Sequence, residues 1–230
     1  MSEKNVQDRV LKHSTQTRSM HWIHVIAFIL LAVTGIGFYW KVGVINNLFG
    51  GGAYASIIHR WAGVVFVGAP AVYILLNFDR FARFIDTITT FGKDDLAWIK
   101  IIGGYVPFIK VKERPPQDKY NAGQKILGWL IIIGCVMIGV TGFCMWLGRY
   151  SLSPAFIDTC YRIHFWTAVF LVIVVAGHFF LAAIFPKSRE EFSSMMIDGY
   201  VDAELSAQHN GKWFAQLKKE DQSLTERNIS

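Results

Sequence analysis

Four long apolar segments without a single Lys, Arg, Asp or Glu recur along the chain. They occupy residues 21–40, 61–78, 126–147 and 163–186. An α-helix rises about 1.5 Å per residue, so about 20 apolar residues cross the roughly 30 Å of hydrocarbon in a bilayer. A soluble helical core would rarely leave four such segments uncharged. The pattern therefore predicts an all-α membrane protein with a four-transmembrane-helix bundle.

The domain organisation follows from these segments. We expect a cytoplasmic N-terminal segment, a transmembrane domain and a cytoplasmic tail over residues 1–19, 20–186 and 187–230. The spans are placed at about 20–40, 56–78, 126–147 and 163–186. The first span ends in Phe38-Tyr39-Trp40-Lys41, an aromatic belt typical of a membrane interface, and it lacks the small-residue cleavage site of a signal peptide.

Composition and charge sharpen this picture. Hydrophobic residues make up 53% of the chain, above the roughly 45–50% of soluble domains. Of 23 Lys and Arg, all but Lys41, Arg60, Arg149 and Arg162 lie in the two tails or between Arg80 and Lys125. Positive loops stay in the cytoplasm, so both termini and the central segment are expected there. The net charge of +6 fits an anionic membrane surface and needs no nucleic acid partner.

The segments between the spans are expected to be partly helical. Residues 94–105 mix apolar and charged positions and predict a short interfacial helix that ends at Gly103-Gly104. The polar stretch from about Lys187 predicts a helical tail. We find no internal repeat of a fixed period.

Histidines inside the spans carry the candidate chemistry. His164 and His178 are fourteen residues apart, which places them about 21 Å apart along one face of the fourth helix. The opposite ligands must lie at matching depths. His59 opens the second span at its outer end, and His21 opens the first at its inner end. Topology thus pairs His59 with His164 and His21 with His178.

Two stacked histidine pairs in a helical bundle favour haem, because each planar macrocycle needs one imidazole on either side of its iron. A zinc site would need about four ligands close together, which the axial separation forbids. The chain has no Cys-x-x-Cys-His motif, so two haems of the b type are expected. Gly35 and Gly63 lie where a porphyrin edge could approach a helix backbone, although either glycine equally suits helix packing.

The remaining histidines and the cysteines have other expected roles. His24 lies one turn from His21 and is an alternative inner ligand that spacing alone does not exclude. His13 and His209 lie in polar tails and are expected to be solvated. Cys135, Cys144 and Cys160 lack the spacing of an iron–sulfur site and are interpreted as packing residues.

Several motifs together resemble a known family, the cytochrome b (gamma) subunits of respiratory formate dehydrogenases. They are Arg18-Ser19-Met20-His21-Trp22, Ile58-His59, the heptapeptide Lys119-Tyr120-Asn121-Ala122-Gly123-Gln124-Lys125, and His164 with His178. The resemblance covers nearly the whole chain, and the heptapeptide is its most specific part. The outer loops and residues 93–118 carry no pattern that aligns with the family.

The resemblance implies a subunit of a larger complex in the bacterial cytoplasmic (inner) membrane. An alpha subunit with molybdenum or tungsten would oxidise formate, and an iron–sulfur (beta) subunit on the outer face would relay the electrons. This chain would then carry them through two haems to a quinone, menaquinone or ubiquinone, near the cytoplasm. The family's quinone pocket corresponds here to Asn121, backbone at Gly123 and the inner ligand His178.

Alternatives remain at this stage. Asn121 also suits a helix N-cap for the third span. The same scaffold serves the cytochrome b subunits of nickel–iron hydrogenases and of thiosulfate or polysulfide reductases. A transporter or proton channel with histidine relays would show no visible absorption, whereas a cytochrome would. Arg60 and Arg162, beside the outer ligands, suit either a haem propionate or a lipid phosphate.

Overall fold

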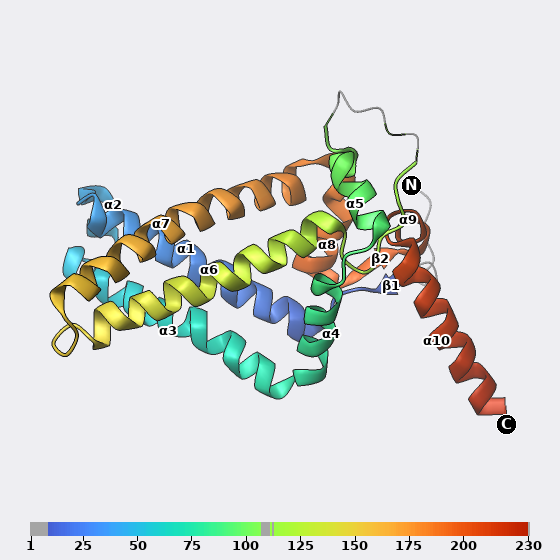
Figure 1. Ribbon diagram of the computed structural model, residues 1–230, viewed down its shortest axis with the longest axis horizontal. Helices are drawn as coiled ribbons and strands as arrows, with labels where there is room; N and C mark the ends of the chain where they lie inside the picture. Colours follow the sequence, from blue (N-terminus) through green and yellow to red (C-terminus); the bar gives the residue numbers. More distant parts are fainter. Residues whose placement is uncertain (1–8, 107–110, 112, 230) are drawn as a thin grey trace. The chain divides into compact units, whose positions relative to one another are not determined.

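The computed structural model describes residues 9–106, 111 and 113–229, and most of them are helical. Four helices are long and apolar enough to cross a membrane, which confirms the predicted fold class (Figure 1). They are α1 (Thr15–Tyr39), α3 (Gly52–Leu76), α6 (Ala122–Leu147) and α7 (Pro154–Phe179). Their share of buried residues is low, as expected for a bundle that faces lipid.

The helices begin earlier in the sequence than the predicted apolar spans. The clearest case is α7, whose first turn holds Pro154 and is capped by Ser153, which accepts a hydrogen bond from the Phe156 backbone at 3.3 Å. Within the next turns Arg162 pairs with Asp158 one turn earlier at 2.9 Å. Charged side chains therefore lengthen the helix beyond its apolar part, and apolar length alone underestimates it.

The chain divides into two compact units. The first, called here the span unit, comprises Thr15–Phe78 and Leu130–Ser188. The second, called the tail unit, comprises Met1–Ser14, Asp79–Trp129 and Arg189–Ser230. The first residues of α6 thus belong to the tail unit and the remainder of this helix to the span unit.

In the span unit, α1 packs along α3, and the short α2 (Gly43–Leu48) lies between them in sequence. Small residues allow other close approaches. A Cβ added at Gly134 of α6 would lie 2.6 Å from Leu171 of α7, and one at Gly139 would lie 2.9 Å from Val67 of α3. Glycines therefore determine where the spans come together, as is common in membrane helices.

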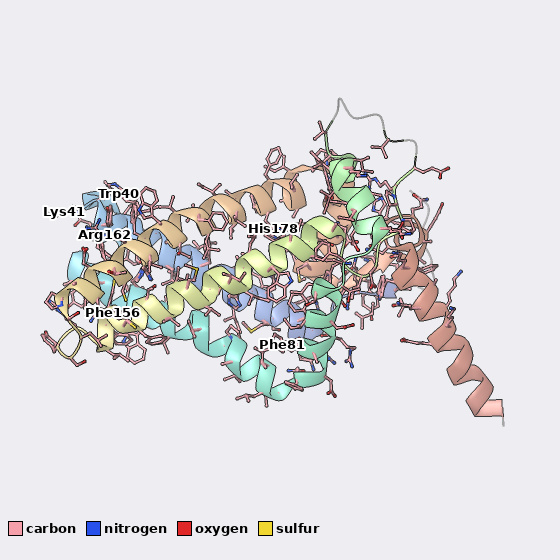
Figure 2. The ribbon with its side chains drawn as sticks, in the orientation of Figure 1. Trp40, Lys41, Phe81, Phe156, Arg162 and His178 are labelled. Carbon is pink, nitrogen blue, oxygen red and sulfur yellow. The ribbon has the colours of Figure 1, made fainter. Side chains whose placement is uncertain are left out.

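Aromatic side chains gather where α1 ends and α7 begins. The Tyr39 ring stacks on Phe165 with ring centroids 4.6 Å apart, and Trp40 lies at 6.0 Å from the same ring. Figure 2 places Trp40, Lys41 and Arg162 at this end of the bundle, and His178 toward the opposite end of α7. The cluster matches the aromatic belt expected from the sequence.

The tail unit includes α4 (Phe78–Thr89), α5 (Lys93–Lys100) and the 3-10 turn η2 (Ile102–Gly104). A short helix is therefore present where one was expected, and the helical segment stops at Gly103 and Gly104, whose φ angles of +57° and +71° favour glycine. Its position at a membrane interface stays a prediction. The indole of Trp98 fills the space between two glycines. A Cβ at Gly103 or Gly123 would clash with it.

The polar C-terminal segment is mostly helical, as predicted. It contains η4 (Pro186–Ser188), α8 (Arg189–Ser193), the π-helical turn η5 (Ser194–Asp198), α9 (Ala203–His209) and α10 (Gly211–Ile229), and the π-helical turn η3 (Phe180–Ile184) precedes it. The strand β2 (Tyr200–Asp202) was not expected. It pairs antiparallel with β1 (Arg9–Leu11), with Arg9 opposite Asp202.

Lys12 follows β1 and is buried in the tail unit. Its ammonium donates to Glu191 at 2.6 Å and to Asn210 at 2.9 Å, and it lies 5.4 Å from the centre of the Trp213 ring. Burial lowers the pKa of Lys12, while the Glu191 carboxylate opposes that shift. The neighbouring His13 is only 4% exposed. The expectation that His13 is solvated is therefore wrong, because the strand pairing covers this end of the chain.

Replacing Glu191 with alanine is expected to destabilise the tail unit by about 3–5 kcal/mol, because it leaves a buried ammonium without its counter-ion. Thermal unfolding of the purified protein in detergent measures the effect. The pKa of Lys12 in the folded protein lies below its ordinary value of 10.5, so burial of the charged ammonium lowers the free energy of unfolding, and this loss diminishes as the pH rises toward that value. The gap between variant and wild type should accordingly narrow between neutral pH and about pH 10.

The matched control is Asp158→Asn, which breaks the exposed Arg162–Asp158 pair. An exposed pair contributes roughly 0–1 kcal/mol, so this change should scarcely move the unfolding temperature. Equal effects of the two substitutions would contradict a special role for the buried pair.

Candidate functional site

The four histidines predicted as ligands all lie on helices of the span unit. His21 is on α1, His59 on α3, and His164 and His178 on α7. The structure brings the rings of His59 and His164 close together across the bundle in an edge-to-face arrangement, with centroids 6.4 Å apart and ring planes inclined at 60°. Two metal–imidazole bonds of about 2.0–2.1 Å on opposite sides of one ion separate ring centres by about 6 Å. The pair is thus spaced for a single metal ion between the two rings.

Hydrogen bonds fix which nitrogen of each ring is available. The Thr34 hydroxyl lies 3.0 Å from Nδ1 of His59, and the Leu31 backbone is a second partner of this ring. The Thr141 hydroxyl lies 3.1 Å from Nδ1 of His164. Because Nδ1 is engaged on both rings, Nε2 is the nitrogen left for a metal.

Glycines let the two rings lie close to neighbouring helices. A Cβ added at Gly35 of α1 would be 3.4 Å from Cε1 of His59, and one added at Gly142 of α6 would be 3.3 Å from Cε1 of His164. Phe38 contacts the His59 ring edge-on, with centroids 5.1 Å apart. Each imidazole is therefore confined both by a hydrogen bond and by steric contact.

The second histidine pair has different surroundings. His21 lies within electrostatic range of His178 and of His24. Its Nδ1 is buried and, among the described residues, has no hydrogen-bond partner. His178 is exposed in the isolated chain, and a Cβ added at the adjacent Gly177 would meet nothing within 4 Å. A buried polar nitrogen without a hydrogen-bond partner is unfavourable. A ligand bound at His21 could remove this cost.

His24 already has a structural task. Pro70 lies inside α3 and has no N–H, so it cannot donate to the Phe66 carbonyl one turn earlier. The His24 ring lies close to the backbone of Phe66 and of Met20, and it contacts the Phe66 ring edge-on, with centroids 4.7 Å apart. His24 is therefore placed where its single ring N–H can take over from the backbone donor that Pro70 lacks.

The donor set suits a group with two axial ligands. Across the described part of the chain, no cluster of three or more His, Cys, Asp or Glu is positioned to bind a metal ion. The three cysteines are free thiols. A tetrahedral zinc or iron–sulfur site among these residues is therefore not supported, whereas paired imidazoles flanked by glycines fit a planar macrocycle.

Asn121 lies in the tail unit and caps α6. Its Oδ1 accepts a hydrogen bond from the Gln124 backbone at 2.9 Å, and the Gln124 side chain accepts one from the Asn121 backbone at 2.9 Å. This reciprocal pair is a capping box. It uses the amide oxygen of Asn121 and leaves the amide NH₂ as a donor. Helix capping and ligand binding, considered above as alternatives, are thus compatible.

Other residues of the heptapeptide are structural. Gly123 faces the Trp98 indole, which lies 2.8 Å from an added Cβ. The Lys125 ammonium is buried against Asp95 at 2.9 Å and donates to the Thr90 carbonyl at 2.8 Å. The heptapeptide is therefore held rigidly to the loop between α4 and α5 and to α5 itself.

The two arginines near His59 and His164 in the sequence, Arg60 and Arg162, have partners within their own unit. The Arg60 Nε donates to the Ser56 carbonyl at 3.1 Å, and its guanidinium lies 5.7 Å from the Trp146 ring centre. Arg162 pairs with Asp158. Each side chain is thus held at the surface of its own helix, Arg60 by a carbonyl and an aromatic ring and Arg162 by a carboxylate.

Sequence reasoning missed Thr34, Thr141 and Gly142. A signal was present, because Val33-Thr34-Gly35 on the first span recurs as Val140-Thr141-Gly142 on the third. Because this tripeptide occurs only twice and belongs to no regular repeat, the sequence alone does not indicate a function for it. The structure supplies it, since each Thr-Gly pair contacts one histidine of the facing pair.

Comparison with known proteins agrees with this geometry. Residues 12–197 match the sequence model of a family described as prokaryotic cytochrome b561. The chain is 28% identical over 225 residues to the formate dehydrogenase cytochrome b556(fdo) subunit of Escherichia coli K12, covering 96% of this chain and 99% of that one. It is 26% identical to the formate dehydrogenase cytochrome b556 subunit of Haemophilus influenzae, covering 94% and 87%. It is 27% identical to the nitrate-inducible cytochrome b556(Fdn) subunit of Escherichia coli K12, covering 88% of each chain.

Proposed function

Because the chain belongs to the prokaryotic cytochrome b561 family, we propose that it is the diheme cytochrome b subunit of a respiratory formate dehydrogenase. In this role it carries electrons from an iron–sulfur subunit on the outer face to a quinone near the cytoplasmic side. Family membership also makes it a multi-pass membrane protein that binds haem b, rather than a transporter with histidine relays.

The observation that carries the proposal is the pairing of His59 with His164. Their 6.4 Å centroid separation, with Nδ1 of each ring already engaged, leaves two Nε2 atoms to bind one iron from opposite sides. When bound, each haem supplies a one-electron ferric/ferrous couple. The histidines would hold the iron, and the glycines beside them let each imidazole lie against the neighbouring helix.

The inner haem is assigned to His21 and His178. Support comes from the unpartnered, buried Nδ1 of His21 and from the open surroundings of Gly177 next to His178. His24 is not assigned, because its ring is engaged by the backbone of Phe66 and Met20. The fourteen-residue spacing of His164 and His178 separates the two sites by about 21 Å, which divides the membrane crossing into short steps.

The quinone site is proposed to include Asn121 and the backbone at Gly123, both of which lie in the tail unit. The Asn121 amide NH₂ can donate to a quinone carbonyl while its oxygen caps α6. The capping box and the Trp98 contact hold this segment in one conformation, which reduces the entropic cost of binding. Either menaquinone or ubiquinone meets this requirement.

The proposed setting is the bacterial cytoplasmic membrane, with both termini in the cytoplasm. Nineteen of the 23 Lys and Arg fall on that side in this arrangement. The relatives are named as subunits of formate dehydrogenases, which supports a role within a complex. The proposed partners are an iron–sulfur subunit and a catalytic subunit with molybdenum or tungsten.

Isolation of the intact complex from native membranes tests this proposal. We expect two haems b per copy of this chain, reduced by formate and reoxidised by a quinone analogue. Co-purification of a nickel–iron or sulfur-compound enzyme, with haem reduction by its substrate instead, would assign the chain to that complex. A preparation without a reduced b-type absorption band would reject the cytochrome assignment altogether.

A further inference from the structure

The two halves of the His59–His164 site are built in the same way. On α1, Thr34 contacts the Nδ1 of His59, and Gly35 lies against the same ring. On α6, Thr141 contacts the Nδ1 of His164, and Gly142 lies against that ring. In both halves a threonine–glycine pair on one long helix supports a histidine on the next long helix of the chain.

The direction of the hydrogen bonds follows from the threonines' other contacts. The Thr34 hydroxyl donates to the Leu30 carbonyl at 2.5 Å, and the Thr141 hydroxyl donates to the Met137 carbonyl at 2.6 Å. A hydroxyl has one proton, so each Oγ1 must accept from the neighbouring histidine. Each ring is therefore protonated at Nδ1, and its Nε2 presents a lone pair.

Both contacts are shielded from water. Thr34 has an exposed fraction of 0% and Thr141 one of 7%. A second acceptor lies near each ring, since the backbone of Leu31 is a partner of His59 and the Ile138 carbonyl lies 3.0 Å from Nδ1 of His164. Removing a hydroxyl would thus weaken the support of the ring without leaving its N–H entirely unpaired.

We propose that Thr34 and Thr141 are matched positioning residues that set the tautomer, the plane and the donor strength of the two axial histidines of the outer haem. This inference rests on the proposed function, which places a haem between His59 and His164. An acceptor at Nδ1–H increases the electron density at Nε2, which stabilises ferric over ferrous iron. The two hydroxyls therefore lower the reduction potential of the outer haem below the value it would have if only backbone groups accepted hydrogen bonds from the two histidine rings.

The test is a redox titration of the complex with Thr34→Val or Thr141→Val, which keep the side-chain shape and remove the hydroxyl. Each change should favour the reduced outer haem by about fivefold at a fixed ambient potential. This ratio corresponds to a rise of about 40 mV, since a tenfold change for one electron is 59 mV. The low-spin ferric EPR signal of the outer haem should shift as well, because it reports the relative orientation of the two imidazole planes.

Two kinds of variant make the result specific. Thr34→Ser and Thr141→Ser retain the hydroxyl and should restore the potential and the EPR signal. Thr159→Val is the matched control, since Thr159 on α7 makes the same type of bond to the Ala155 carbonyl, at 2.9 Å, in an exposed position. It should leave both haems unchanged. If a valine variant does not assemble, the alanine variant at that position serves the same purpose without overpacking.

The outcomes separate this inference from the function on which it rests. Valine variants with the wild-type potential and EPR signal, in a complex whose outer haem is lost on His59→Ala, would overturn the positioning role alone. An outer haem that survives both His59→Ala and His164→Ala would overturn the ligand assignment and the inference with it. A serine variant that behaves like valine would also reject a role for the hydroxyl.

Discussion

Replacement of His59 or His164 with alanine is expected to lower the haem content of the complex from two haems b per chain to one. Each of these rings supplies one of the two axial bonds at a single site, and no other described His, Cys, Asp or Glu is clustered there to replace it. Pyridine haemochrome analysis against protein concentration measures the stoichiometry. The remaining haem should keep its wild-type reduced spectrum, because the inner site shares neither residue.

The inner site is tested in the same assay. His21→Ala or His178→Ala should remove the other haem, whereas His24→Ala should retain both and affect stability instead, since it breaks the contact with the Phe66 backbone. Retention of both haems in His21→Ala together with loss of one in His24→Ala would assign His24 as the inner ligand.

The second large effect is expected at Asn121. Replacement with alanine removes both the helix cap and the amide donor, whereas replacement with aspartate keeps a strong cap and removes only the NH₂ group. Both variants should keep two haems that the upstream donor reduces. Quinone turnover should fall in both, because losing a buried hydrogen bond of about 1–3 kcal/mol corresponds to a roughly 5- to 150-fold change. Separate stopped-flow measurements of haem reduction and haem reoxidation locate the defect.

Gln124→Leu provides the matched control. It breaks the other half of the capping box, in which the Gln124 side chain accepts from the Asn121 backbone, and leaves the Asn121 amide intact. The helix should lose about 1 kcal/mol of stability while quinone turnover per assembled complex stays normal. Normal turnover in Asn121→Asp would reject Asn121 as a quinone ligand, and a slow Gln124→Leu would show that capping alone accounts for the effect.

The spans and the histidine pairs are the parts that sequence reasoning predicts best. In hydrocarbon every helix must be long and uncharged, so the four segments are evident from composition alone. His164 and His178 share one helix, and helical geometry then fixes the depth at which each partner must lie. The 6.4 Å approach of His59 to His164 confirms that this pair is brought together.

Contacts between segments that carry no pattern of their own could not be predicted. The strands β1 and β2 contain only three residues each, which is too short to show an alternating pattern in the sequence. Their pairing joins Arg9 to Asp202, far apart along the chain. Burial of Lys12 and His13 follows from that pairing. The threonine contacts were equally hidden, because a threonine within an apolar helix ordinarily bonds to its own backbone, and only the fold reveals a histidine beside it.

Pro70 restricts the order in which substitutions can occur during the evolution of this bundle. The Phe66 carbonyl depends on a side chain from another helix, the His24 imidazole, as long as proline occupies position 70. A lineage that loses His24 first leaves a carbonyl without a donor in a membrane, where such a defect is costly. A lineage that first replaces Pro70 by a residue with an N–H restores the backbone hydrogen bond to the Phe66 carbonyl. Substitutions of His24 then no longer leave that carbonyl without a donor. The two positions should therefore be inherited together and lost in one order, proline before histidine.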